Sequence, residues 1–284
     1  MTADDPPAES ASAWLARTGY IAAGQGCARA WLFVSPHLDD AVLSCGALME
    51  ALAFEGRVCV ATVFTEGGQM PWSVPSLRAT ARSGRSLADL FELRRNEDRA
   101  VLQAMSVEPF HLGFADGQFR ALSTLGQGQP SLLRKLLARV PLYPTFRWDL
   151  ARGRVAPPDR ALVEFIRAEL LQLVDRLSPS PSLVFAPLGV GSHVDHLLAR
   201  DAAARLGLPT IYYSDFPYSE QSVPRRDFVE GRNLVPHLWL AGRLANAERV
   251  REYGSQLAGI FPDGRVPYRP EVYWAPATAS ATPA

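Results

Sequence analysis

A strand, a helix and a second strand follow one another over residues 31–65, and this order restricts the fold more than any other feature of the chain. Trp31–Ser35 reads WLFVS, an unbroken apolar run that ends at Pro36 and is typical of a strand buried on both faces. Ala41–Phe54 has helical spacing of Ala and Leu, and Val58–Thr65 is rich in β-branched residues. Such a βαβ unit joins two parallel strands, so the sequence predicts a parallel sheet.

The same alternation of elements continues along the rest of the chain. The further predicted elements are a helix at Asp89–Met105, a short strand at Phe110–Leu112, a helix at Arg160–Leu177, a strand at Leu183–Ala186, a helix at His193–Leu206, a strand at Thr210–Ser214 and a helix at Gly242–Gln256 before a Tyr/Pro-rich tail. Alternating strands and helices predict an α/β fold, a doubly wound, mostly parallel sheet sandwiched by helices, in a single domain over residues 1–284. Ligands of such folds bind beyond the carboxyl ends of the strands, where the strand order reverses.

Three parts of the chain do not follow this alternation. Residues 1–12 and 276–284 consist mostly of small and polar residues and are predicted to be unordered. Residues 117–160 combine a helical piece, Ser131–Val140, with several Gly and Pro residues, and we interpret them as an inserted lid over the sheet edge. The insertion and a nearby loop carry aromatic side chains that are suited to stack on a sugar, namely Trp72, Tyr143, Phe146 and Trp148.

The composition excludes several classes of partner. Lys and Arg together number 29, and so do Asp and Glu, so no charge excess favours nucleic acid or a polyanionic substrate. The longest apolar runs, such as Val58–Phe64, are too short to span a bilayer, and Met1–Ala11 lacks the pattern of a secretion signal. Cys27, Cys45 and Cys59 form no CxxC pair, which favours a reducing cytoplasm.

Histidines and aspartates gather in two short turns, each directly after a predicted strand. Three of the five histidines lie in Pro36–Asp40, which reads PHLDD, and in Ser192–His196, which reads SHVDH. If the two strands are neighbours in the sheet, both turns face one crevice at its carboxyl edge. Zinc-type ions prefer His nitrogen and carboxylate oxygen, and in catalytic sites they take three such ligands and keep one position open. The turns therefore predict a divalent metal site with one His and one Asp left over to act as acid and base.

Structural roles are also open to several of these residues. Asp39 or Asp40 is suited to cap the helix that begins at Ala41. Ser192 and Asp195 have the spacing of a capping box. The two remaining histidines lie outside these turns and are expected to be structural, hydrogen-bonded residues: His111 and His237.

The two turns and two further segments resemble the signatures of the N-acetylglucosaminyl-phosphatidylinositol de-N-acetylase family, also called LmbE-like. The turns are similar to the family's Pro-His-Pro-Asp-Asp and His-x-Asp-His motifs. Arg94–Glu97 reads RRNE, like the family's Arg-x-x-Glu helix, and Leu112–Gly117 reads LGFADG, like its Leu-Gly-x-x-Asp-Gly segment. The resemblance covers Trp31–Ser214 except Gly117–Arg160, and it implies a Rossmann-like zinc deacetylase.

This resemblance also implies a role for individual residues. It implies that the zinc ligands are His37, Asp40 and His196 and that Asp39 is the general base. His193 would stabilise the oxyanion or protonate the leaving amine, and Arg94 and Asp116 would lie at substrate-binding positions. A purely structural role stays open for two of these residues. Arg94 is equally able to pair with Glu97 or Asp98 on the helix surface. Asp116 and Gly117 could likewise form only a turn.

Three positions depart from the family pattern. Leu38 replaces the second Pro of the first motif, and Ala41 replaces an acidic residue that often follows it; neither change removes a ligand. Gly191 stands where some relatives have a Tyr that polarises the amide, so a polarising Tyr has to come from elsewhere. The candidates are Tyr212, Tyr213 and Tyr218.

The residue pattern and the resemblance both predict metal-assisted amide hydrolysis. With Zn²⁺ or another divalent metal such as Fe²⁺, Asp39 would take the proton of the attacking water, while His193, held by Asp195, assists the oxyanion and the leaving amine. The expected substrate is an N-acetylglucosamine-type sugar on a larger glycoconjugate or natural product. The alternatives are an amidase for another amide, such as a thiol conjugate of an amino sugar, and a non-catalytic sugar-binding relative.

Overall fold

A seven-stranded sheet forms the centre of the computed structural model, which describes residues 10–19, 30–67, 81, 84–121, 140–145 and 149–277. The strands are β1 (Ala30–Ser35), β2 (Arg57–Glu66), β3 (Glu108–Ala115), β4 (Leu183–Pro187), β5 (Thr210–Tyr213), β6 (Leu234–Trp239) and β7 (Glu271–Pro276). Their order in the sheet is β3-β2-β1-β4-β5-β7-β6. The first five pair in parallel, and β7 pairs antiparallel with both β5 and β6. The strand order reverses between β1 and β4.

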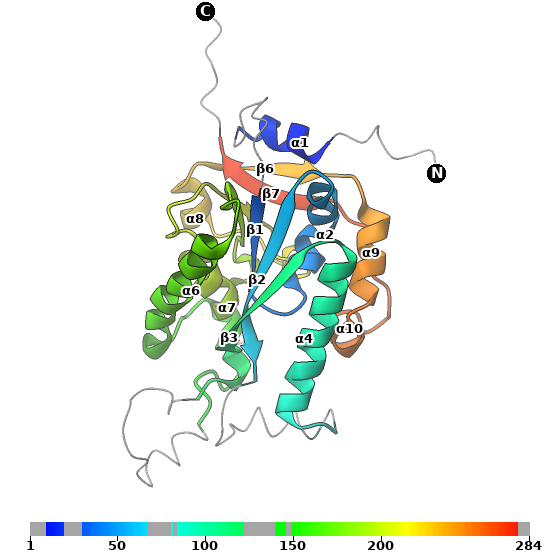
Figure 1. The fold of residues 1–284 in the computed structure, drawn as a ribbon. Helices are drawn as coiled ribbons and strands as arrows, with labels where there is room; N and C mark the ends of the chain where they lie inside the picture. The colour runs from blue at the N-terminus through cyan, green and yellow to red at the C-terminus, as the bar shows by residue number, and fades with distance from the viewer. Residues whose placement is uncertain are drawn as a thin grey trace, which may run out of the picture.

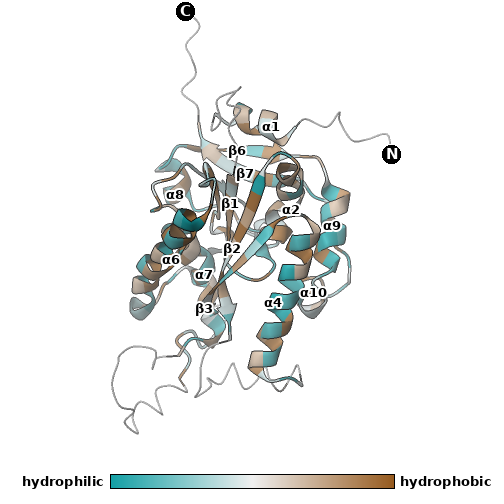
Figure 2. Ribbon diagram, viewed as in Figure 1, coloured by the Kyte–Doolittle hydropathy of each residue, from teal (hydrophilic) through white to brown (hydrophobic). Residues whose placement is uncertain are grey.

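Helices cover both faces of the sheet (Figure 1). The helices are α1 (Ala11–Arg17), α2 (Asp40–Ala53), α4 (Leu87–Ala104), α6 (Leu162–Arg176), α7 (Val194–Ala203), α8 (Arg226–Glu230), α9 (Arg243–Arg251) and α10 (Gly254–Ile260). Residues of α1, α2, α4 and α9 share one hydrophobic core, and residues of α6, α7 and α8 share the other. In Figure 2, α4 and α6 each mix hydrophilic and hydrophobic residues, as expected for helices with one face in a core.

The first strand shows why its sequence is apolar throughout. Trp31 and Phe33 belong to the core on one face of the sheet, and Leu32 and Val34 belong to the core on the other. All six residues of β1 are buried. The predicted doubly wound α/β sheet is confirmed in this parallel part, and the strand pairing brings the two His/Asp turns to one edge.

The C-terminal region differs from the prediction. The single helix expected over 242–256 is two helices, α9 and α10, which are separated at Glu252 and Tyr253. The segment expected to be a tail supplies β7, which pairs with both β5 and β6. Antiparallel strands of a sheet margin are half-buried and short, and here Pro236 and the alternating burial of β6 hid the pattern.

The insertion and the chain ends are described only in part. Residues 1–9 and 278–284, the helical piece at 131–139, and Trp72, Phe146 and Trp148 lie outside the described residues. Residues 11 and 12 belong to α1, and residue 276 ends β7, so these three do not fit the unordered ends that the sequence predicts. Within the insertion, Tyr143 and Leu150 are buried against Val194 of α7. None of the helices in the described ranges is long and apolar enough to cross a membrane.

Helix α4 depends on a side-chain cap at its start. Ser86 occupies the N-cap position, and its hydroxyl oxygen accepts a hydrogen bond from the Asp89 main-chain N–H at 3.1 Å. We expect Ser86→Ala to lower the free energy of unfolding by about 1 kcal/mol in urea denaturation, since one N–H loses its partner. Ser86→Asp, which can still cap, is the control, and an equal loss in both variants would show that the cap is not the cause.

Candidate active site

A cavity of about 360 Å³ lies where the strand order reverses, beyond the carboxyl ends of β1 and β4. Six of the eight residues to which the sequence analysis gave a catalytic, metal-binding or substrate-binding role line it: His37, Asp39, Asp40, Arg94, Asp116 and His193. They come from four segments, the turns after β1, β3 and β4 and the helix α4. The two others, Asp195 and His196, are buried at 0% and 1% exposure in the first turns of α7.

One carboxylate oxygen is the meeting point of the predicted metal ligands. Asp40 Oδ2 lies 3.0 Å from His37 Nδ1 and 3.3 Å from His196 Nε2. It also accepts a hydrogen bond from the His37 main-chain N–H at 2.9 Å, which closes the turn after β1. His37, Asp40 and His196 therefore form a compact group of three ligands of the type that binds a divalent ion.

Each of these two histidines has a buried carboxylate on its other ring nitrogen. His196 Nδ1 lies 2.6 Å from Asp215 Oδ1, and His37 Nε2 lies 3.0 Å from Asp195 Oδ2. Metal-ligating histidines usually donate their second N–H in this way, which fixes the tautomer and the ring orientation. Asp40 and Asp215 outweigh burial and raise the pKa of His196 to about 9.

Asp215 is a site residue that the sequence analysis missed. It lies just after β5, and its Oδ2 accepts hydrogen bonds from the main-chain N–H groups of Gly189 and Val190 at 2.8 and 2.7 Å. One carboxylate thus joins the His196 ring to the turn after β4. The sequence signal that could have identified Asp215 is its position just after a buried strand, at the carboxyl edge of the sheet.

His196 Nε2 indicates that a metal ion fits this group. This atom is buried and makes no hydrogen bond within the described part of the chain, although it lies 3.3 Å from Asp40 Oδ2. Because Asp215 accepts the Nδ1–H, Nε2 is the ring nitrogen left to bind a cation, which would replace the proton that Nε2 carries in the metal-free site. The donor set of two imidazoles and one carboxylate suits zinc-class ions.

Asp195 has a different position from the one expected. Asp195 was expected to hold the His193 ring, but its carboxylate contacts His37 and accepts a hydrogen bond from the Gly117 main-chain N–H at 2.7 Å. The bond between the two residues runs the other way, from the Asp195 main-chain N–H to His193 Nδ1 at 3.3 Å. His193 itself is the N-cap of α7, so the predicted Ser192–Asp195 capping box does not form.

This cap determines what His193 can do. Because Nδ1 accepts a hydrogen bond, the neutral ring carries its proton on Nε2. Burial lowers the pKa of His193 to about 3, so the ring is neutral at ordinary pH. His193 therefore presents one N–H donor in the cavity, which suits an oxygen that gains negative charge.

Arg120 is a second residue that the sequence analysis missed. It is 4% exposed, and its guanidinium pairs with Asp195 Oδ1 at 2.5 Å and with Asp159 Oδ2 at 2.8 Å. Its Cζ lies 5.0 Å from the Phe64 ring centroid and 5.5 Å from that of Tyr143. Arg120 thus ties the inserted segment to Asp195 and, with His37, outweighs burial to hold the pKa of Asp195 well below its usual range.

Asp39 lies beside the three-ligand group but outside it. It occupies the N-cap position of α2 without making a side-chain capping bond, so the capping alternative is wrong for Asp39. Burial, together with the neighbouring Asp40, raises the pKa of Asp39 to about 7. A carboxylate that is 8% exposed in a cavity and bound to no cap is available for proton transfer.

Arg94 and Asp116 both reach the cavity. The helix-surface pair considered for Arg94 does not form, because Glu97 bonds to Ser255 and Asp98 bonds to His111 and Tyr253. Asp116 belongs both to a turn and to the cavity. Its Oδ1 accepts a hydrogen bond from the Gln118 main-chain N–H at 2.8 Å in the turn, and its Oδ2 lies 4.0 Å from His37 Nε2.

The two histidines outside the His/Asp turns do not belong to the group of three ligands. His111 Nε2 pairs with the buried Asp98 at 2.8 Å, which agrees with the structural role expected for it. His237 lies on β6 at the far margin of the sheet.

Of the three tyrosines considered as donors to the amide, only Tyr218 lies at the cavity. Tyr213 donates its hydroxyl to the Val34 carbonyl at 2.8 Å, and Tyr212 packs edge-on against Phe228. Tyr218 instead lines the cavity, with its ring centroid 5.3 Å from that of His196 and 6.2 Å from that of His193.

Gly191 explains how Tyr218 reaches this place. Gly191 has φ +79°, and a Cβ on it would lie 2.8 Å from the Tyr218 Cβ. The Tyr218 side chain therefore occupies the space beside the missing side chain of residue 191. Burial, and then Asp40 and Asp39, raise the pKa of Tyr218, so its hydroxyl keeps its proton and remains a donor.

The buried pair of His196 and Asp215 leads to a prediction about metal affinity. Asp215→Asn removes the charge that orients His196, so we expect metal affinity to fall about 10- to 100-fold, measured by titration against a competing chelator. Asp201→Asn is the control, because Asp201 pairs with Arg200 and is 39% exposed. Unchanged affinity in Asp215→Asn would mean that this carboxylate does not orient a ligand.

Comparison with known proteins agrees with this geometry. Residues 32–206 match the family model for GlcNAc-PI de-N-acetylase (PIG-L). The chain is 31% identical over 236 residues to a 2′-N-acetylparomamine deacetylase of Streptomyces fradiae, covering 79% of this chain and 72% of the relative. It is 26% identical over 284 residues to a protein of the same name from Niallia circulans, covering 87% and 90%.

A solved structure has the same fold. It is the zinc-inhibited form of the teicoplanin deacetylase Orf2, with a TM-score of 0.67 at 24% identity, covering 86% of this chain and 97% of that one. The family model spans both His/Asp turns and the parallel strands that bring them together. The chain therefore belongs to the GlcNAc-PI de-N-acetylase (PIG-L) family.

Proposed function

We propose that the protein is a metal-dependent deacetylase that hydrolyses the N-acetyl group of an N-acetylglucosamine-type sugar within a larger glycoconjugate or natural product. The observation that carries the proposal is the free carboxylate of Asp39, which lies in one cavity with a three-ligand metal group. A protein that only binds sugar needs no base at this position. The names of the two relatives, both 2′-N-acetylparomamine deacetylases, support an amino-sugar substrate and a role in antibiotic biosynthesis.

His37, Asp40 and His196 would hold the ion, which we propose is Zn²⁺ or another divalent metal such as Fe²⁺. When bound, such an ion lowers the pKa of water and polarises a carbonyl oxygen. Asp39 accepts the proton of the attacking water, and it can return that proton to the leaving amine nitrogen. His193, through Nε2–H, and Tyr218, through its hydroxyl, donate to the carbonyl oxygen as it becomes negative. The products are a free amine and acetate.

Arg94 and Asp116 complete the proposed site as substrate-binding groups. Arg94 has its Cζ 5.5 Å from the Phe91 ring centroid, and its buried Nε makes no hydrogen bond to any described residue. A guanidinium and a carboxylate that line the same cavity are suited to bind sugar hydroxyls.

Tyr218→Phe tests the proposed oxyanion donor. Removal of one such donor is expected to lower kcat about 10²- to 10³-fold with little change in KM, because the bond strengthens only in the transition state. Tyr212→Phe is the matched control, since Tyr212 packs against Phe228 outside the cavity. Equal kcat values for the two variants would remove Tyr218 from the mechanism.

The function itself is tested by acetate release. The metal-loaded protein is incubated with 2′-N-acetylparomamine and with free N-acetylglucosamine, and acetate is followed by proton NMR. We expect acetate and a free amine in equal amounts from at least one of the two. No release from either, with metal bound in stoichiometric amount, would refute the proposal.

A further inference from the structure

A second cavity lies next to the catalytic one, at the same edge of the sheet. Its volume is about 410 Å³, which is within the range of small-molecule sites. Leu43 of α2 lines both cavities, and the segment 216–219 forms the wall between them. Pro217 and Tyr218 line the catalytic side of this wall, whereas Phe216 and Ser219 line the other.

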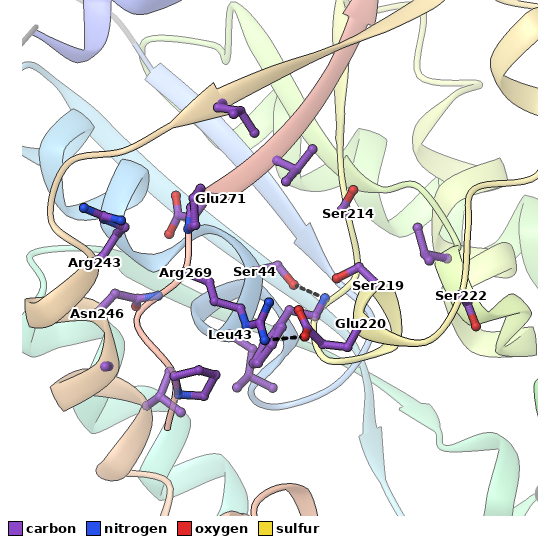
Figure 3. Close-up of a pocket in the computed structure, with 18 of the residues that line it drawn as sticks. Leu43, Ser44, Ser214, Ser219, Glu220, Ser222, Arg243, Asn246, Arg269 and Glu271 are labelled. Atoms are coloured by element: carbon purple, nitrogen blue, oxygen red, sulfur yellow. Dashed lines mark hydrogen bonds and ion pairs between the residues drawn. The ribbon is translucent and has the colours of Figure 1, made fainter. Parts of the chain in front are cut away.

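Hydrogen bonds join the elements that wall this second cavity, and Figure 3 shows three of the side chains that take part, Ser44, Ser214 and Glu271. The Glu271 carboxylate at the start of β7 accepts from the main-chain N–H groups of Ala47 and Leu48 in α2, at 2.7 and 3.0 Å. Ser44 accepts from the Phe216 N–H at 3.1 Å, and Trp274 donates to Ser214 at 2.9 Å. A cavity whose helix, strand and loop are tied together in this way is already formed before a ligand arrives.

Four charged residues line the cavity, two basic and two acidic. Arg243 and Arg269 face two acidic residues, Glu220 and Glu271. Arg269 pairs with Glu220 at 2.6 Å, and Glu271 is 5% exposed, with its oxygens in the hydrogen bonds just described. Because Arg269 is paired with Glu220, the lining presents no cluster of arginines for a phosphate or another anionic group.

The remaining polar groups have free bonding capacity. The hydroxyls of Ser219 and Ser222 make no hydrogen bond to any residue that the structure describes, and both residues line the cavity. Asn246 also lines the cavity, but its Oδ1 is buried against Gly46 of α2. Phe216, Val266 and Val272 supply apolar surface between these groups. Hydroxyl groups beside apolar C–H faces are what sugar and cyclitol rings present to a protein.

We propose that this second cavity binds the next ring of the substrate, a hydroxyl-bearing ring without anionic groups that is linked to the N-acetylated sugar. The inference rests on the proposed function and deepens it. With the N-acetyl group at the metal-type cluster, the attached ring extends past the wall 216–219 and enters the adjoining cavity. The second cavity thus selects glycoconjugates over free monosaccharides, and its contribution to binding is independent of the acetyl group.

Filling the cavity tests this assignment. Ala247 of α9 lines it and is 2% exposed, so Ala247→Phe occupies part of its volume. We expect KM for 2′-N-acetylparomamine, which has a second hydroxyl-bearing ring, to rise about tenfold or more, equal to the loss of about 1.4 kcal/mol of binding. KM for free N-acetylglucosamine should stay within twofold of the wild-type value. Ala245→Phe is the matched control, because Ala245 lies on the same helix but is exposed and outside the lining.

A second variant covers the case in which overpacking of α9 prevents folding. The double variant Ser219→Ala/Ser222→Ala removes only the two free hydroxyls and should raise KM for 2′-N-acetylparomamine alone. Equal KM changes for both substrates, or no change for either, would overturn the second-ring assignment and leave the deacetylase proposal intact. Failure of the wild-type protein to hydrolyse either substrate would instead refute the proposed function, and this assignment with it.

Discussion

The Asp39→Ala variant should bind metal as the wild-type protein does and lose kcat by roughly two to four orders of magnitude. Asp39 lies in the catalytic cavity beside the ligand group, but it makes no capping bond and does not belong to the three ligands. Its removal therefore takes away the group that accepts the proton of the water and leaves the metal site in place. Acetate release and elemental analysis of the same preparation measure both quantities.

Two further variants make this test specific to proton transfer. Asp39→Asn keeps the size of the side chain and should lose turnover as Asp39→Ala does, because an amide cannot accept the proton. Asp40→Asn should behave in the opposite way and lose metal, since Asp40 Oδ2 is the meeting point of both histidines. A kcat near the wild-type value in Asp39→Ala, or loss of metal in that variant, would show that the two aspartates have been assigned wrongly.

Most of the parallel half of the fold was predictable because four of its strands, β1, β2, β4 and β5, are buried on both faces, whereas β3 is only half-buried. Runs such as WLFVS in β1 and VCVATVFT in β2 place successive residues in the two cores, so the whole run has to be apolar. The antiparallel margin had no such pattern. In β6, buried and exposed residues alternate and Pro236 interrupts the donors, which obscured a strand that the sheet nevertheless includes.

The metal ligands of the site were predictable from the sequence, whereas the residues that hold them in place were not. His37, Asp40 and His196 lie in two short turns, where close spacing in the sequence and the carboxyl-edge rule both apply. Asp215 and Arg120 lie in other segments and meet the histidines or Asp195 only through the folded sheet. No spacing rule connects residues 120 and 195, so these buried ion pairs became visible only in the structure.

The role of Asp195 shows the limit of local reasoning most directly. Its place between two histidines suggested that it holds His193, but side chains two residues apart on a helix do not face each other. In the structure the helix turns its carboxylate towards His37, 158 residues away in the sequence, and Arg120 neutralises it there. Asp195 is thus a partner of a ligand from the first turn, and the two motifs are joined by it.

His196→Ala is expected to lower metal affinity more than any other single change outside the first turn, and the triple variant His37→Ala/Asp40→Ala/His196→Ala should bind no metal in stoichiometric amount. His196 is 1% exposed, its Nε2 lies 3.3 Å from Asp40 Oδ2 without a hydrogen bond to any described residue, and Asp215 orients its ring. Its loss therefore removes a ligand and leaves a buried carboxylate without its imidazole. Elemental analysis of protein reconstituted separately with Zn²⁺ and Fe²⁺ measures the stoichiometry and the preferred ion.

The matched control for this test is His237→Ala, which removes an imidazole on β6, at the far margin of the sheet from the ligand group. Its metal content should equal that of the wild-type protein, at one ion per chain. If the triple variant still carried one ion per chain, the ion would have to bind elsewhere, and the site built on Asp40 would be wrong. If the wild-type protein bound no ion at all, the buried Nε2 of His196 would need another partner, and the proposed hydrolysis would lose its activated water.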